Sequence, residues 1–177
     1  MKALSNHVFR DHVLIGGVAA ALLLPVLGRQ GSLLFWLATI FVDIDHYFEF
    51  LSAVRYRIFG FRSMFRFFEE LFHLRHRPEF LAMEIFHTAE FLALLAVLAL
   101  GLGGAFPPVF WGVLFHMAVD FVHLGRYKAL SKRSPSLLEY GWRRRKFLSE
   151  GKNPDLVYED ALRAAHLDPD SAGGRKA

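Results

Sequence analysis

Four long apolar stretches dominate the sequence, at residues 13–28, 31–54, 80–102 and 107–124. A helix needs about 20 residues to cross the hydrocarbon core of a bilayer, so stretches of this length predict membrane-spanning helices. The first is slightly short, and we expect it to recruit residues from Val8 onward. The pattern therefore predicts an all-α protein, an integral membrane four-helix bundle. A soluble helical core is the less favoured alternative, because such runs are long for a chain of this size.

A different pattern occupies residues 52–79, where arginines alternate with aromatic residues. On a helix, Arg62, Arg66 and Glu69 share one side. The other side carries Phe61, Phe65, Phe68 and Phe72. Nucleic-acid grooves also mix arginine with aromatic residues, but an apolar side edged by arginines is typical of a helix at a membrane surface. Between two apolar stretches, this pattern predicts an interfacial amphipathic helix.

The basic residues indicate an orientation. Every lysine and arginine except Arg29 lies before the first stretch, between the second and third, or after the fourth. Cytoplasmic loops of membrane proteins are enriched in these residues, so we expect both termini to be cytoplasmic in a multi-pass protein of the cytoplasmic (inner) membrane. The net charge of +4 is then explained by topology and lipid contact, and we expect no nucleic-acid partner.

The end of the chain has a more polar composition. We divide the sequence into a membrane bundle at residues 1–128 and a basic linker with a short soluble cytoplasmic helical tail at residues 129–177. Asn153 and Pro154 are typical of a helix start, and the helix that they begin is predicted to run to about Leu167.

Ionisable residues interrupt the apolar stretches, although each costs about 2.5–3.5 kcal/mol at the centre of a membrane helix. They are Asp43, Asp45, His46, Glu49, Glu84, His87, Glu90, His116, Asp120 and His123. The predicted topology places them all toward the cytoplasmic side, where His12 opens the first stretch. Residues of this kind usually face the interior of a bundle and carry function.

Their spacing favours metal binding. His116 lies four residues before Asp120, which lies three residues before His123, so all three can share one helix face. Helix bundles commonly build dinuclear metal sites from inward-facing histidines and carboxylates. The chain has no cysteine, so these residue types must supply the ligands. The set suits a divalent metal, zinc foremost with manganese or iron as alternatives, and could hold two ions.

The same residues resemble a family of inner-membrane metal-dependent hydrolases of unknown substrate, distantly similar to zinc phospholipase C and P1 nuclease. The matching positions are His12, the Asp-Ile-Asp-His run at 43–46, His87, and Gly112 with His116 and Asp120 at four-residue intervals. The resemblance covers about residues 7–124 and leaves out the tail. The chain departs from the family at residues 82–88, where the usual His-Arg-Gly motif is missing.

The resemblance implies a hydrolase whose two metal ions activate a water and clamp a phosphoester. The implied metal ligands are His12, Asp43, Asp45, His46, His87, His116 and Asp120, with Glu84, Glu90 and His123 as further candidates. Asp45 would bridge, orient a ligand or act as general base, and Asp120 could bridge both ions. The depth of the site and the arginines nearby indicate a lipid-like phosphoester at the cytoplasmic leaflet.

Two other classes of function fit the polar residues. Histidines at 12, 46, 87 and 116 could be axial ligands in a four-helix haem or electron-transfer protein, although haem does not require the buried carboxylates. Asp43, Asp45 and Asp120 could instead line a proton or ion pathway, which would predict flux without turnover. A purely structural role for the polar residues is the remaining alternative.

Overall fold

The computed structural model describes residues 4–126 and 129–167, with side chains from residue 10 onward. The described chain is all-α, as the hydrophobic pattern predicts. The helices are α1 (Leu4–Leu22), α2 (Leu24–Phe41), α3 (Ile44–Ala53), α4 (Phe61–His73), α5 (Ala89–Leu102), α6 (Phe106–Arg126), α7 (Leu137–Ser149) and α8 (Asp155–Ala164). Short 3-10 turns lie at Leu74–His76 (η1), Ile85–His87 (η2) and Leu130–Lys132 (η3).

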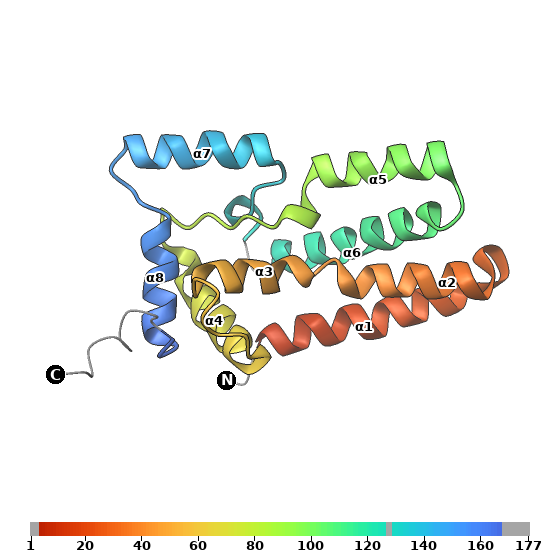
Figure 1. Cartoon of the computed structure of the whole chain (residues 1–177), viewed down its shortest axis with the longest axis horizontal. Coiled ribbons are helices and arrows are strands. Elements are labelled where there is room, and N and C mark those ends of the chain that lie inside the picture. The colour runs from red at the N-terminus through yellow and green to blue at the C-terminus, as the bar shows by residue number, and fades with distance from the viewer. Residues whose placement is uncertain (1–3, 127–128, 168–177) are drawn as a thin grey trace.

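Helices α1, α2, α5 and α6 form a bundle of two hairpins that point the same way (Figure 1). Helix α2 packs most extensively on α6, and α1 and α5 flank this pair. Gly112 makes the close approach possible, because a Cβ atom there would lie 2.4 Å from the Phe35 carbonyl oxygen. The two helices therefore meet backbone to backbone beside the polar residues.

The helix bounds correct three of the predicted stretches. The first helix ends at Leu22. Within the bounds of α2, the backbone leaves the helical conformation at Gly28, whose φ is 66°, and the chain turns there. The second stretch breaks between Phe41 and Ile44, where α2 gives way to α3. The third helix starts at Ala89, nine residues later than the pattern indicates. Apolar runs mark where the chain is buried or lipid-facing, but they do not show where backbone hydrogen bonds change partners.

Residues 80–88 leave the helical path because their backbone pairs elsewhere. The Ala82 amide donates to the Lys132 carbonyl at 3.1 Å, and the Ala82 carbonyl accepts from the Ser134 amide at 3.4 Å. Thr88 then caps α5 by accepting the Phe91 amide with its hydroxyl oxygen. This pairing brings the segment after α6 back against the bundle.

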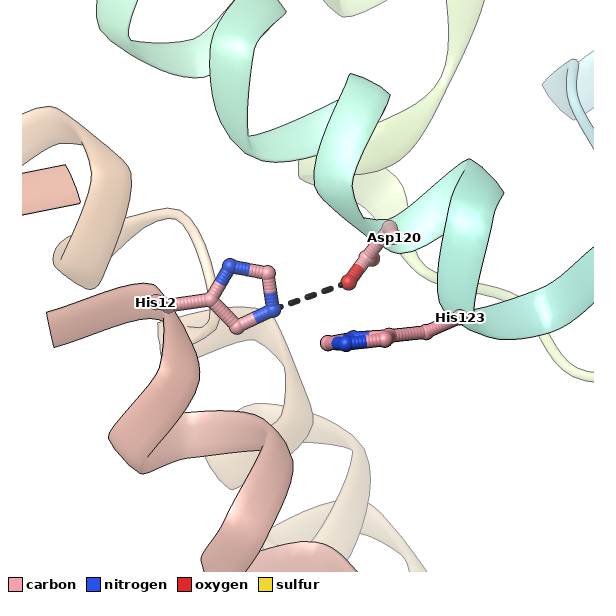
Figure 2. A group of neighbouring side chains, drawn as sticks. All are labelled: His12, Asp120 and His123. Atoms are coloured by element: carbon pink, nitrogen blue, oxygen red, sulfur yellow. Dashed lines mark ion pairs between the residues drawn. The ribbon is translucent and has the colours of Figure 1, made fainter. Parts of the chain in front are cut away.

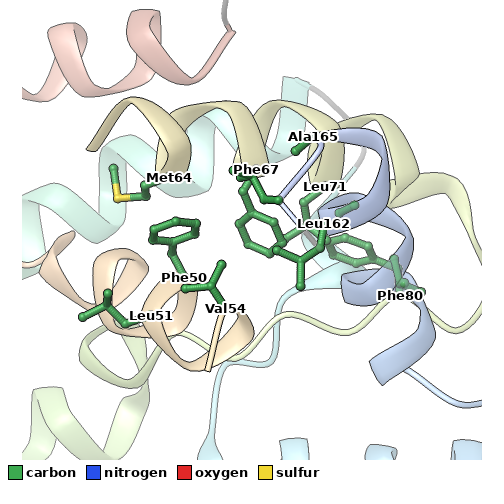
Figure 3. Packing of buried hydrophobic residues seen from close by; sticks show 12 residues of the cluster. Phe50, Leu51, Val54, Met64, Phe67, Leu71, Phe80, Leu162 and Ala165 are labelled. Carbon is green, nitrogen blue, oxygen red and sulfur yellow. The ribbon is translucent and has the colours of Figure 1, made fainter. Parts of the chain in front are cut away.

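A second core joins α3, α4 and α8 (Figure 3). Phe50, Phe67 and Val157, one from each helix, are fully buried in it. The predicted tail helix is therefore present, begins directly after Pro154 as expected, and packs against the rest of the chain.

Helix α4 is the amphipathic helix predicted between the second and third stretches. Phe65 and Phe68, from the side that the sequence assigns to lipid, are partly buried against the second core, whereas Phe61 is exposed. Part of the side that the sequence assigns to lipid is thus a protein–protein contact within the chain.

Within the described residues, two segments are long and apolar enough to cross a membrane: Leu24–Ala53, which joins α2 and α3, and Phe106–Arg126. Their most apolar windows are only 28% and 22% buried. Helix α5 is apolar but has 14 residues, fewer than a full crossing requires.

Candidate metal centre

The polar residues of the apolar stretches meet where the four-helix bundle borders the second core. Asp43 and Asp45 lie at the junction of α2 and α3, because the helix breaks there. His87 ends η2, and His116 lies midway along α6. His12 comes from α1 and is also buried. These residues come from four separate parts of the chain, and helix packing brings them together.

Four ligand atoms converge on one point. The Nε2 atoms of His87 and His116 are 2.9 Å apart. Asp43 Oδ1 lies 3.4 Å from the first nitrogen and 3.3 Å from the second. Asp120 Oδ2 lies 3.6 Å and 3.5 Å from the same two atoms. A tetrahedral zinc ion with bonds of about 2.0–2.1 Å places its ligand atoms roughly 3.4 Å apart, so the four His–Asp separations are close to those of a zinc site.

In each of these two histidines, the hydrogen bond made by Nδ1 determines the protonation of Nε2. His116 Nδ1 donates to the Thr39 carbonyl at 2.8 Å. His87 Nδ1 donates to Asp45 Oδ2 at 3.0 Å. Carbonyl and carboxylate oxygens only accept hydrogen bonds, so both Nδ1 atoms carry a proton, and in the neutral imidazoles both Nε2 atoms then present lone pairs. Two lone pairs that face each other at 2.9 Å repel, and a cation between them removes the repulsion.

The Thr39 acceptor follows from the helix break. The last four carbonyls of a helix have no partner within it. Thr39 lies within the last turn of α2, which ends at Phe41, so its carbonyl is free to receive His116. Asp45 is held from the other side, because its Oδ2 also accepts the Phe86 amide at 3.0 Å.

A second group of ligand atoms adjoins the first through Asp120. His12 Nε2 lies 3.0 Å from Asp120 Oδ1. Figure 2 shows His123 approaching the same space from the next turn of α6. Atoms of His12, Asp120 and His123 lie within 4.8 Å of one another, close enough to hold an ion. Asp120 thus presents one oxygen to each group. The His12 ring also stacks on His116, with centroids 3.9 Å apart.

Arg133, which the sequence assigned only to a basic linker, also lies at the centre. Its Nη1 lies 2.7 Å from Asp120 Oδ2, and its Nη2 contacts Glu84 Oε2. Burial opposes its charge, but the carboxylates of Glu84 and Asp120 outweigh burial and raise the pKa of Arg133 above its ordinary value. No sequence pattern marks this arginine, because the pairing of residue 82 with residues 132–134 is what carries it inward.

His46 lies beside the centre. Its Nε2 is 3.7 Å from Asp43 Oδ1, and its Nδ1 is 3.6 Å from Glu49 Oε2. The Tyr158 hydroxyl of α8 donates to Glu49 Oε1 at 2.6 Å. Burial and the Glu49 carboxylate both raise the pKa of Tyr158 well above its ordinary value. The tail helix therefore supports the outer edge of the site.

The other predicted residues have different positions. Glu90 caps α7, where it accepts from Ser136 Oγ at 2.5 Å and from the Leu137 amide at 3.1 Å. Glu84 reaches the centre through Arg133. Three histidines outside the apolar stretches, His73, His76 and His166, are exposed.

Comparison with known proteins adds no relative. No family model, curated protein or solved structure matches the chain. What stands is an all-helical protein with buried His/Asp groups that could bind a metal ion.

Proposed function

We propose that this protein is a membrane-embedded metal-dependent hydrolase that acts on a phosphoester of a lipid or another amphiphile at the cytoplasmic leaflet. The observation that carries the proposal is the pair of facing His87 and His116 Nε2 atoms, 2.9 Å apart with both Nδ1 atoms already donating. This arrangement, ringed by two carboxylates, suits a divalent cation such as zinc.

The chain's residues have distinct roles in this proposal. Asp43, His87 and His116 would hold one ion, and Asp120, which faces both groups, would hold a second ion with His12 and His123. Asp45 orients His87 and supports its basicity, a role that its hydrogen bond favours over direct ligation. Two ions held there would supply an activated water and would bind two oxygens of the phosphoester.

A membrane location is supported by what surrounds the site. Apolar side chains cover the far half of the bundle, and Val26 and Leu100 are 80% and 90% exposed. Soluble proteins rarely expose large continuous apolar surfaces. The basic residues flank the ends of the apolar stretches that carry the ionisable residues. By the positive-inside rule, the side nearer the metal centre is then the cytoplasmic one.

The decisive experiment is elemental analysis of detergent-purified protein. We expect about two equivalents of zinc, manganese or iron per chain in the native protein, and none in the double variant Asp43→Ala/Asp120→Ala. The matched control is His73→Ala, which removes an exposed histidine and should keep the metal. Metal-loaded protein is then assayed with phosphoesters.

Two results would reject the proposal. Native protein that stays metal-free after reloading would leave a proton pathway or a polar core as the function of the cluster. An intense haem absorption band would assign the histidines to haem instead.

A further inference from the structure

A cavity of about 770 Å³ lies beside the metal centre, between α4, the α2–α3 junction and the segment after α6. We infer that this cavity binds the single hydrocarbon chain of an anionic amphiphile and delivers its phosphate head to the metal centre. The inference rests on the proposed function and adds the substrate class: phosphates that carry one long alkyl or polyprenyl-like chain.

The far part of the cavity is lined by apolar side chains. Phe65, Phe68 and Phe72 lie along the α4 wall, and Ile40 and Leu124 lie on the bundle wall. These surfaces offer no groups that could satisfy a peptide backbone, which would leave its polar groups unpaired at a cost. A hydrocarbon chain has no such groups, so it is the ligand that this lining fits.

The near part of the cavity is lined by the site itself. Asp43, Asp120 and His123 line it, and so do Lys132 and Arg133. The boundary between the two parts falls at Phe68, whose ring is 5.2 Å from that of His46. A ligand whose chain lies against α4 therefore has its head beside the metal ligands.

Charge at the near end favours an anionic head. Arg133 pairs with Asp120 and Glu84, while Lys132 Nζ donates only to a neutral acceptor among its described hydrogen bonds, the Arg77 carbonyl at 2.9 Å. Cations bonded to neutral oxygens retain charge for a phosphate.

The open side of the cavity indicates from where the hydrocarbon chain of the ligand enters. Phe41, Ile44 and Phe61 line the cavity and are also exposed. An apolar rim of this kind is stable where the surroundings are apolar, so the rim suits entry from a bilayer. The size of the cavity falls within the range of about 300–1,000 Å³ that encloses one small ligand, which favours one chain over two.

The test measures how affinity depends on chain length. The affinity of metal-loaded protein in lipid nanodiscs is measured for butyl, octyl and dodecyl phosphate, each used below its micelle concentration. Each buried methylene is worth about fourfold in affinity, so dodecyl phosphate should bind at least about 100-fold more tightly than butyl phosphate. Equal affinity for all three lengths in the native protein would overturn the inference, whatever the variants do.

Two variants locate the chain. Leu124→Trp and Met64→Trp place bulk in the cavity from opposite walls and should reduce the chain-length gain below about tenfold. The matched control is Leu94→Trp on α5, which is exposed and outside the cavity, and it should keep the full gain. A gain that survives both filled variants would place the chain elsewhere and overturn the inference.

Metal content, measured in every sample, separates the two proposals. Bound metal with no dependence on chain length rejects the cavity and leaves the hydrolase proposal standing. Chain-length dependence in protein that never binds metal supports the cavity and rejects the hydrolase.

Discussion

His87 and His116 show how hydrogen bonds to one side of an imidazole prepare the other side for a metal. The Thr39 carbonyl and the Asp45 carboxylate accept hydrogen bonds from the Nδ1 atoms, and the Nε2 atoms are left to face each other. The helix break that frees the Thr39 carbonyl also places Asp43 and Asp45. One local irregularity thus supplies both a ligand and the groups that orient ligands.

Replacing Asp45 tests its orienting role. Asp45→Asn keeps the shape of the side chain but removes the charge that holds His87, so metal affinity should fall by about 10–100-fold. Competition with a chelator measures this change. Asp155→Asn, which alters an exposed carboxylate paired with Arg144, should leave affinity unchanged. Equal affinity in Asp45→Asn and native protein would contradict the role.

His123 distinguishes one ion from two. It contributes to the group with His12 and Asp120 but lies outside the cluster around His87. His123→Ala should therefore lower the metal content from two ions per chain to one. Elemental analysis of both proteins, normalised to protein mass, gives the ratio. A complete loss of metal would show that the two groups are not independent.

The packing of α2 on α6 depends on the absence of a side chain at one position. A Cβ at residue 112 would lie 2.8 Å from the Ala38 Cβ, besides its contact with the backbone of α2. Gly112→Ala should therefore destabilise the protein by about 1–3 kcal/mol, seen as a lower Tm. Gly101→Ala on α5 meets open space and should not lower the Tm. Equal Tm values for the two variants would refute the close approach.

The docking of α8 depends on Tyr158. Its pKa is raised in the folded state, so the stability that it contributes is fully present below its unfolded value of about 10 and is lost as pH rises through the folded value. Tyr158→Phe leaves Glu49 without its 2.6 Å donor and should cost about 1–3 kcal/mol at neutral pH.

Urea unfolding at pH 7.5 and at pH 10.5 measures both effects. The difference in stability between native protein and Tyr158→Phe should shrink at the higher pH. A difference that grows with pH would contradict the sign of the shift.

The orientation of the whole protein can be tested directly because the chain has no cysteine. Single cysteines at Ala105, in the exposed turn between α5 and α6, and at Leu138, on α7, report opposite sides in the proposed topology. A membrane-impermeant thiol reagent added to intact cells should label Ala105→Cys and should label Leu138→Cys only after lysis. Equal labelling of both in intact cells would exclude this topology.

Composition and periodicity predict the all-α class, the amphipathic helix at α4 and the start of the tail helix, because each depends on residues close together in sequence. The same reasoning selects the residues of the centre, since ionisable groups are conspicuous within apolar runs. It misplaces the third helix, because a hydrophobic run looks alike whether its backbone pairs within a helix or with another segment.

Only the tertiary packing determines which position each of these residues takes in the centre. Asp43 and Asp45 are two positions apart, yet one faces the ligand nitrogens and the other holds a ligand from behind. Arg133 reaches Asp120 only because residue 82 pairs with the chain beyond α6. The sequence pattern identifies the side chains that are costly to bury, whereas long-range contacts determine which partners stabilise them when they are buried.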